Sequence, residues 1–421
     1  MIKNNVNFKI INSTPLSHDH NVGFHDIKPF NPNSKELLLL HRYPKKFLLN
    51  KNKLIKTEIC LWDYNKNIIK KISNTTAFSW EQGSRLQWYS NEKIIFNLRK
   101  KNKIKTLIKN INNQKEEILD NSFYSLSCNK DILSLNYERL WYLWNTYGFY
   151  FNGIKQKISP KPDYDGIFIY NNKKKNNELI LSIHDAVNLC NLEKYQYNFF
   201  LTHPTFSPDG QKFVSILRNF NHLNNLMGYM ILTDIRTKKS KVIAFEKVSH
   251  FEWLNNSEII VWCRNINHKI SMLRNTKLFE NIIVNPIKKT LKFINFKNSQ
   301  DLITSNYYKI NINQPEKKII LDKNFFKEDG HPQLSKDKRF IITDTYEKNN
   351  GYQDLILYDL FKKKGYLLGS FKVSNFLKKN NLKCDLHPRW NNHYFINIDS
   401  SHQGSRQTYI LDIENFIDKI R

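Results

Sequence analysis

The stretch that decides the fold is Thr202-His203-Pro204-Thr205-Phe206-Ser207-Pro208-Asp209-Gly210, which is followed by the apolar run Lys212-Phe213-Val214-Ser215-Ile216-Leu217. Proline fixes φ and glycine accepts a positive φ, so the Ser-Pro-Asp-Gly segment predicts a tight turn. Apolar residues on both sides of a turn are typical of two antiparallel strands. Residues 202–217 are therefore predicted to form a β-hairpin.

The same pattern of a polar residue, an apolar residue, a turn and a short strand recurs along the whole chain. The innermost strands of its copies are predicted to start near seven positions, namely His25, Gln82, Tyr124, His203, His250, His331 and His387. A four-stranded blade takes roughly 40 to 50 residues, and longer spacings are explained by loop insertions. The repeats therefore predict an all-β fold, a seven-bladed β-propeller, formed by residues 1–421 as a single domain.

Other segments fit the remaining strands of such blades. Five apolar runs, most of which end in or near Asp, are predicted to be third strands: 58–64, 166–170, 229–234, 354–359 and 407–412. The N-terminal segment, residues 1–20, contains an apolar run at residues 6–11 that is predicted to complete the last blade, since an unpaired sheet edge is unfavourable. Only residues 181–189 and 371–377 look helical.

The composition is strongly basic, with 66 Lys and Arg against 38 Asp and Glu and a net charge of +28. The lysines are scattered among asparagines, a composition that an AT-rich genome favours. No stripe of basic residues interleaved with aromatic residues is present, as a single-strand binding groove would require. A nucleic-acid partner is therefore disfavoured, although the charge favours anionic ligands over cationic ones.

The five cysteines form no CxxC motif and no short pairing, so neither a disulfide framework nor a thiolate zinc site is indicated. The first residues lack the apolar stretch of a signal peptide, and no apolar run is long enough to span a bilayer. A reducing, cytoplasmic location without a membrane span is the expectation.

Four of the repeats carry histidine at the same place: His203, His250, His331 and His387. Equivalent positions of a propeller lie close together around its axis, so these imidazoles are expected to converge at one mouth of the channel. His25, followed by Asp26, opens the first blade and could join them. Two interpretations remain open, because neutral imidazoles bind divalent metal ions, whereas histidines in this position can also hydrogen-bond neighbouring blades and keep them in register.

The Phe-Ser-Pro-Asp-Gly hairpin resembles the repeats of TolB-type propellers, and the order of the histidine motifs resembles that of the oligogalacturonate lyase family. Members of that family are seven-bladed propellers that cleave digalacturonates by metal-assisted β-elimination. His203 matches the family's His-x-x-Phe-Ser-Pro element, residues 249–253 loosely match its Gly-His-x-x-Trp element, and His331 matches the next histidine. The resemblance covers about half of the chain, from the fourth blade onward.

The chain also departs from that family. A glutamine and two nearby histidines form the family's next metal segment, but Asp329-Gly330-His331-Pro332 offers one histidine, so the shell is incomplete unless His387 or Asp385 fills it. The Asp385–Trp390 and Asp344–Tyr346 elements also resemble those of propellers found in bacterial polysaccharide contexts.

The resemblance implies a metal-dependent enzyme that acts on acidic oligosaccharides by β-elimination. It implies His203 as the base, His250 and His331 as ligands of a divalent metal, manganese before others, and His387 as a further candidate ligand. Arg389, Arg85 and Arg139 are candidates for pairing with the substrate carboxylate, since a guanidinium group matches a carboxylate in a bidentate way. For each arginine, an ordinary surface or blade-linking role is favoured over substrate binding.

Two further alternatives stay open. The chain could be a non-catalytic TolB-like propeller that binds a protein or a glycan in polysaccharide biosynthesis, because a fold does not imply a function. The aromatic segment 141–150 either stacks on sugar rings or caps the core, and the core is favoured.

Overall fold

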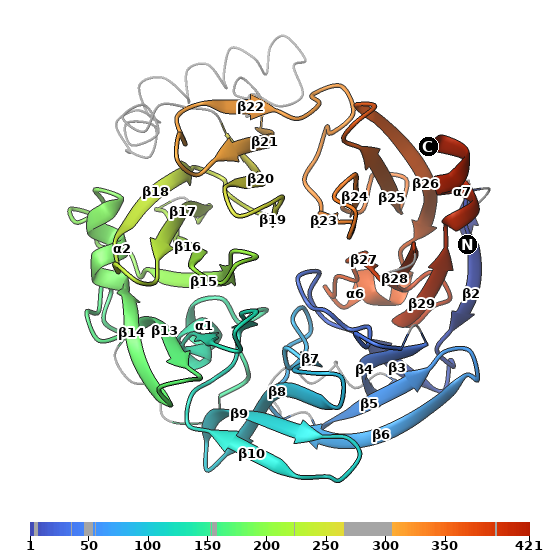
Figure 1. The fold of residues 1–421 in the computed structure, drawn as a ribbon, viewed down its shortest axis with the longest axis horizontal. Coiled ribbons are helices and arrows are strands. Elements are labelled where there is room, and N and C mark those ends of the chain that lie inside the picture. The colour runs from blue at the N-terminus through green and yellow to red at the C-terminus, as the bar shows by residue number, and fades with distance from the viewer. Residues whose placement is uncertain are drawn as a thin grey trace.

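A computed structural model describes the chain except for residues 4–6, 35, 46–53, 55, 152, 154–157, 223, 265–304, 392 and 393. The described strands form seven antiparallel sheets arranged in a ring around a central axis (Figure 1). The chain is thus a seven-bladed β-propeller, and the fold predicted from its repeats is confirmed.

Each sheet is one blade, and its strands follow one another outward from the axis. The first blade contains β3 (His18–Asn21), β4 (Leu37–Pro44), β5 (Thr57–Asp63) and β6 (Ile68–Thr75). The second contains β7 (Gln87–Trp88), β8 (Lys93–Lys100), β9 (Lys103–Asn110) and β10 (Glu116–Leu119). The third contains β11 (Ser125–Leu126), β12 (Ile132–Ser134), β13 (Gly166–Asn171) and β14 (Asn176–Ser182). The fourth and fifth blades are β15 (Phe200–Phe206), β16 (Lys212–Phe220), β17 (Leu226–Asp234) and β18 (Ser240–Phe245); and β19 (Phe251–Trp253), β20 (Glu258–Arg264), β21 (Ser305–Asn311) and β22 (Lys318–Ile320). The sixth blade contains β23 (Gln333–Leu334), β24 (Phe340–Asp344), β25 (Tyr352–Asp359) and β26 (Lys364–Lys372), and the seventh contains β27 (Arg389–Trp390), β28 (Phe395–Ser400) and β29 (Gln407–Asp412).

The hairpin predicted from residues 202–217 is formed by β15 and β16. The five segments predicted as third strands lie in β5, β13, β17, β25 and β29, each of which is the third strand of its blade. Alternating apolar residues of these strands fill the spaces between neighbouring blades. Between the sixth and seventh blades, for example, Phe340 and Leu357 belong to the same buried cluster as Ile398 and Leu411.

The N-terminal segment adds strands to two blades. Strand β2 (Lys9–Ser13) pairs with β29 and becomes the fourth strand of the seventh blade, and β1 (Ile2–Lys3) pairs with β26 of the sixth blade. In Figure 1, β2 lies beside β29 at the outer rim, where the two ends of the chain are close together. The ring is thereby closed by pairing between the first and last parts of the chain.

The first blade departs from the predicted pattern. Its inner strand is β3, and His25 lies in the loop that follows, where the sequence analysis had placed the start of the inner strand. The chain turns toward the axis at Gly23, whose φ is +119°. A Cβ at this position would lie 2.8 Å from the Gln82 carbonyl oxygen, so the close approach of the two backbones requires glycine. The loop of residues 22–28, here called the axial loop, enters the middle of the ring.

The described helices are short: α1 (Tyr137–Leu143), α2 (Ile183–Leu189), α6 (Asn375–Lys379) and α7 (Glu414–Ile420). The prediction for residues 181–189 corresponds to α2, whereas the prediction for 371–377 is wrong at its start, because Phe371 belongs to β26. Helices α1 and α7 were not predicted, because α1 is short and contains three aromatic residues, and none of the described side chains caps α7. None of the described helices has the length and hydropathy needed to cross a membrane.

Candidate functional site

The axial loop is held in the middle of the ring by side chains from three other blades. Arg389 of the seventh blade donates hydrogen bonds to the carbonyl oxygens of Gly23 and Phe24. Arg85 of the second blade binds both oxygens of Asp26, at 2.7 and 2.8 Å. The Gln333 amide of the sixth blade donates to the His25 carbonyl at 3.1 Å. The loop therefore fills the axis that the inner strands surround.

Five histidine rings surround the Phe24 ring of this loop. Their centroids lie between 4.6 and 6.0 Å from that of Phe24, and they belong to His25, His203, His250, His331 and His387. The structure thus brings together the four histidines of the repeats and His25. Burial lowers the pKa of His25, His203, His331 and His387 well below the usual histidine value, so these four rings are neutral near pH 7.

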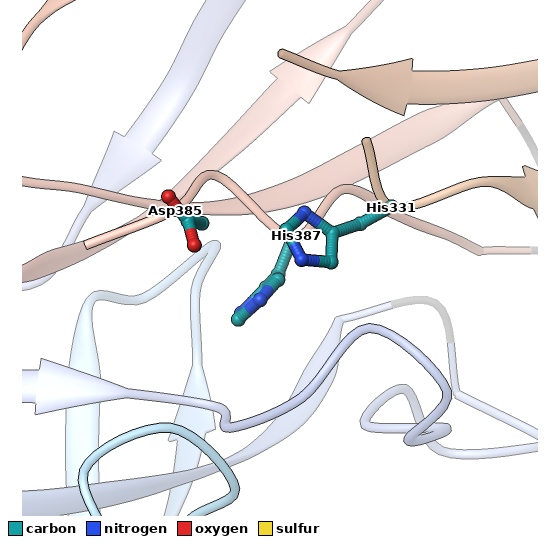
Figure 2. A group of neighbouring side chains, drawn as sticks. All are labelled: His331, Asp385 and His387. Carbon is teal, nitrogen blue, oxygen red and sulfur yellow. The ribbon is translucent and has the colours of Figure 1, made fainter. Parts of the chain in front are cut away.

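Among the described residues, His331, Asp385 and His387 form the one group of histidine, cysteine or carboxylate side chains arranged to hold a metal ion (Figure 2). One donor atom from each residue lies within 4.8 Å of the other two, and all three side chains are buried. His331 and His387 come from equivalent positions in the sixth and seventh blades. Asp385 lies two residues before His387, on the segment that leads into β27.

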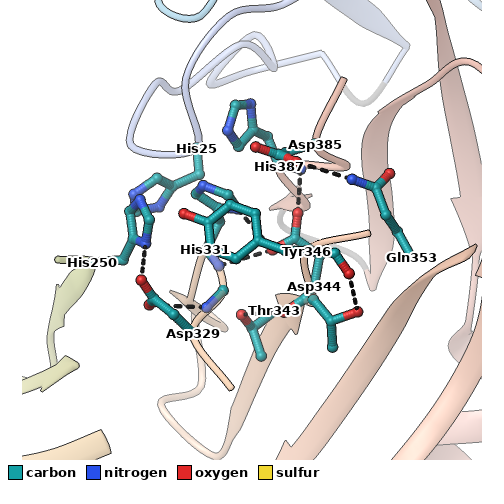
Figure 3. A network of polar contacts seen from close by, with 12 residues as sticks. His25, His250, Asp329, His331, Thr343, Asp344, Tyr346, Gln353, Asp385 and His387 are labelled. Carbon is teal, nitrogen blue, oxygen red and sulfur yellow. Dashed lines mark hydrogen bonds and ion pairs between the residues drawn. The ribbon is translucent and has the colours of Figure 1, made fainter. Parts of the chain in front are cut away.

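Hydrogen bonds orient each member of this group. The His387 Nδ1 lies 3.1 Å from the Gly23 carbonyl, which can only accept, so Nδ1 carries the hydrogen and Nε2 keeps its lone pair. That Nε2 atom is buried without a hydrogen-bond partner in the described structure. The Gln353 amide donates to one Asp385 oxygen at 2.9 Å and leaves the other oxygen free of this contact (Figure 3).

Asp344 contacts both histidines of the group. One of its oxygens lies 2.8 Å from the His331 Nδ1, and the other accepts the His387 backbone N–H at 2.9 Å. Burial raises the pKa of Asp344 to about 7, and burial together with the nearby Asp344 raises the pKa of Asp385 to about 6. A cation beside these carboxyl groups would favour their charged form.

His250 lies beside the group but is not part of it. Its ring centroid is 4.2 Å from that of His331, and its Nδ1 lies 3.1 Å from an Asp329 oxygen and 3.1 Å from the Ser249 hydroxyl. Because a carboxylate only accepts, Asp329 fixes the hydrogen on Nδ1 and leaves the Nε2 lone pair available. His250 and Asp329 together have the arrangement of an oriented general base.

His203 has a different environment. Its backbone φ is +53°, a strained value for a residue other than glycine, and its buried Nδ1 has no hydrogen-bond partner in the described structure. Its ring lies against Phe24 and Tyr147, with centroid separations of 5.2 and 5.5 Å. The ring is accessible from the cavity described below, but no described side chain orients it.

The three arginines singled out in the sequence are engaged within the protein. Arg85 pairs with Asp26, and the Arg389 guanidinium donates to the axial loop and to Asn397 at 2.8 Å. Arg139 donates to the Phe199 carbonyl at 2.9 Å. None of these three arginines lines the cavity above the histidines.

A cavity of about 480 Å³ lies next to the histidines that surround Phe24. His203, His250 and Asp385 lie in its wall, so the oriented base and one member of the candidate metal group face the same space. The aromatic residues of the wall are Phe78, Trp80, Trp141, Trp144, Tyr147, Tyr150 and Tyr346, and its charged residues besides Asp385 are Glu81, Arg218 and Lys383. The aromatic segment 141–150 therefore forms one side of the cavity, while Phe149 of the same segment is buried in the core.

Arg218 is the arginine of this cavity. It is only 5% exposed, its Nε donates to the Thr202 hydroxyl at 3.1 Å, and its guanidinium lies 5.2 Å from the centre of the Trp144 ring. Across the part of the chain that the structure describes, no carboxylate forms an ion pair with it. Burial lowers its pKa, but an arginine stays charged at neutral pH. The cavity thus contains a cationic group with capacity for an anionic ligand.

Sequence reasoning did not identify Arg218, Asp329 or Asp344 as site residues. The sequence contains one feature that singles out Arg218, which is the polar residue directly after the apolar run of the best repeat. Asp329 lies two residues before His331, and Asp344 begins an element already noted for its resemblance. Their roles depend on contacts between blades, which the sequence does not display.

Comparison with known proteins gives matches among solved structures alone. No protein-family model matches the sequence, and no curated protein matches it. Among solved structures, an oligogalacturonate lyase in complex with manganese superimposes with a TM-score of 0.62 at 10% identity, over 96% of this chain and 96% of that chain. TolB from Acinetobacter baumannii gives a TM-score of 0.37 at 12% identity, over 85% of this chain and 78% of that chain. The first likeness shows that the two proteins share the seven-bladed propeller fold.

Proposed function

We propose that this propeller is a metal-dependent enzyme that cleaves an acidic oligosaccharide by β-elimination. One observation carries the proposal: His331, Asp385 and His387 form a buried donor group beside a cavity that also contains an oriented histidine and an arginine that pairs with none of the described carboxylates. A purely structural role would not require Asp385, His250 and Arg218 to face one space.

The donor group fits a divalent metal ion. Two neutral imidazoles and one carboxylate suit manganese, iron or zinc. The Nε2 atom of His387 is buried without a hydrogen-bond partner in the described structure, so its lone pair is available to a metal ion. Manganese is favoured, since the lyase structure with the same fold was determined with that metal. A divalent ion held by these residues would neutralise a substrate carboxylate and acidify the neighbouring C–H bond.

Arg218 is proposed to bind the carboxylate of the sugar. Its guanidinium is held in place by Thr202 and Trp144, so little side-chain entropy is lost when a ligand binds. A buried guanidinium and a carboxylate form strong, charge-assisted hydrogen bonds. Arg218 takes this role in place of Arg85, Arg139 and Arg389, whose guanidinium groups are bound within the protein.

His250 is proposed to be the base. Its Nε2 accepts the proton from the carbon next to the carboxylate, while Asp329 stabilises the resulting imidazolium. The electrons of the broken C–H bond form the new C=C bond, and the glycosidic oxygen leaves and takes a proton from water. The hydroxide that remains takes the proton from His250, so water and the base are both regenerated. This assignment gives His250 the role of base that the resemblance implied for His203, because Asp329 hydrogen-bonds the His250 ring and no described side chain hydrogen-bonds the His203 ring.

Metal content tests the centre first. We expect protein purified without a histidine tag to bind near-stoichiometric manganese, iron or zinc, and His387→Ala to lose it, as measured by plasma mass spectrometry. His20→Ala is a matched control, because His20 is equally buried but hydrogen-bonds Gln407 away from the group. If the wild type binds no metal after reconstitution with manganese, the enzyme proposal fails and a binding role is favoured.

Activity tests the base. On acidic oligosaccharides, followed by the ultraviolet absorbance of the unsaturated product, His250→Gln should lower kcat by about 10²- to 10⁴-fold and leave the metal content unchanged. His203→Gln should have a smaller effect on kcat. The opposite pattern, with metal lost in His250→Gln and kcat lost in His203→Gln, would restore the assignment suggested by the sequence.

A further inference from the structure

We propose that Asp344 is the positioning residue of this metal centre, and that its carboxylate holds both ligand histidines in the geometry that binds the metal. The inference rests on the proposed function, because it concerns the same group of His331, Asp385 and His387. It assigns a role to a residue that does not itself belong to the donor group.

Asp344 makes three contacts that converge on the two histidines (Figure 3). Its Oδ1 accepts hydrogen bonds from the His331 backbone N–H and from the His331 Nδ1, both at 2.8 Å. Its Oδ2 accepts the His387 backbone N–H at 2.9 Å. The side chain is fully buried at the end of β24, so these contacts do not compete with solvent.

The first pair of contacts fixes the tautomer of His331. Because the carboxylate only accepts, the hydrogen of the ring stays on Nδ1, and Nε2 keeps the lone pair that a metal requires. A carboxylate on the far nitrogen of a ligating histidine also raises the basicity of the ring and restricts its rotation. His331 is therefore set as a ligand by Asp344.

The third contact sets the distance between the two ligands. His331 belongs to the sixth blade and His387 to the seventh, and one carboxylate binds the backbone N–H groups of both. The ring of His387 is oriented separately by the Gly23 carbonyl. Asp344 thus joins two blades at the position where their side chains must converge.

A matched control lies in the same blade. Asp359 ends β25, is fully buried, and pairs with Arg339 at 2.8 Å, but contacts no histidine of the centre. Replacing Asp359 removes a buried carboxylate from the sixth blade without touching the centre. Comparing the two replacements separates a general loss of stability from an effect on the metal.

The experiment is a titration with Mn²⁺ by isothermal calorimetry, on metal-free full-length protein. Asp344→Asn should weaken Mn²⁺ binding by about 10- to 100-fold, since outer partners of ligating histidines typically contribute that much. The amide nitrogen of Asn cannot accept a hydrogen bond, so one contact is lost even though the shape is kept. Asp359→Asn should leave the Mn²⁺ affinity within about twofold of the wild type, and circular dichroism should show that both variants are folded.

Two further variants keep the test decisive. Asp344→Glu, which retains two acceptor oxygens, should bind Mn²⁺ more tightly than Asp344→Asn and also serves if the Asn variant does not fold. In the His331→Ala variant, Asp344→Asn should weaken Mn²⁺ binding by a smaller factor than in the wild type, because part of the effect of Asp344 acts through His331. Equal Mn²⁺ affinity of Asp344→Asn and the wild type would overturn this inference alone, whereas a wild type that binds no Mn²⁺ would overturn the proposed metal centre with it.

Discussion

At the residue scale, the axis of this propeller is built from imidazoles whose hydrogen-bond partners orient them. His387 donates through Nδ1 to a carbonyl, and His250 and His331 donate through Nδ1 to carboxylates. In each case the partner selects which ring nitrogen keeps a lone pair. Each of these histidines can therefore hydrogen-bond a neighbouring segment through one ring nitrogen and present the other to a metal ion or a proton. The two interpretations of the repeated histidines, as blade-linking and as metal-binding residues, are thus compatible.

A histidine that is buried in its neutral form makes the folded protein less stable in acid, and this effect can be measured at His41. His41 is fully buried, with Nδ1 3.2 Å from the Asn21 carbonyl and Nε2 2.8 Å from the Ser84 hydroxyl, and burial lowers its pKa to about 3. Between pH 6.5 and pH 3 the unfolded chain binds a proton at this position and the folded chain does not. The free energy of unfolding therefore falls as the pH decreases, by about 1.4 kcal/mol per pH unit for this group.

We expect His41→Gln to remove that contribution. Between pH 6.5 and pH 4.5 the variant should lose about 2 to 3 kcal/mol less unfolding free energy than the wild type, as measured by urea denaturation at each pH. His184→Gln is the control, since it replaces a histidine that is exposed on α2. Parallel pH profiles for His41→Gln and the wild type would contradict the prediction.

The candidate site could be predicted from the sequence only where the repeats define it. The histidines share one position in several repeats, so their convergence follows from the fold. Arg218 could not be distinguished from Arg85 or Arg389, because what separates them is whether a partner lies nearby in space. Asp385 was predicted only as a residue that could complete the shell, and its role became visible through its distance to His331 and His387.

At the scale of elements, hairpins were predictable and the axial loop was not. A hairpin is specified by a turn and two neighbouring apolar runs, all within about 20 residues. The axial loop depends on distant partners, for example on the contact between Gly23 and His387, which are 364 positions apart. The same limitation explains why the inner strand of the first blade was placed too far along the chain.

Strand β2 gives a prediction at this scale. Removing residues 1–13 should lower the melting temperature by several degrees and increase aggregation, because it leaves β29 as an unpaired edge. Differential scanning calorimetry of the truncated and full chains measures the effect. Removing residues 1–3 is the control, since it takes away only β1, the fifth strand of a blade that already has four. Equal melting temperatures for the full chain and the chain without residues 1–13 would show that β2 does not stabilise the ring.

At the scale of the whole molecule, the axis of the propeller is not an open channel. The axial loop fills the middle of the ring, and the cavity of about 480 Å³ lies above the histidines that surround it. A ligand therefore reaches the candidate site from the cavity side. The net charge of the chain, +28, gives the molecule a positive field that attracts anions over distances greater than a contact.

This field predicts how binding of an acidic oligosaccharide depends on salt. Raising the ionic strength from about 0.1 M to about 1 M shortens the screening length from about 10 Å to about 3 Å, so the affinity should fall by about tenfold or more. Quenching of Trp80, Trp141 and Trp144, which line the cavity, provides the measurement. Arg218→Gln should weaken binding at every salt concentration but keep most of the salt dependence, because Arg218 acts by contact and the remaining charges act at a distance. A neutral oligosaccharide of the same length should show no such dependence, and an acidic ligand whose affinity ignores salt would mean that the basic composition does not contribute to binding.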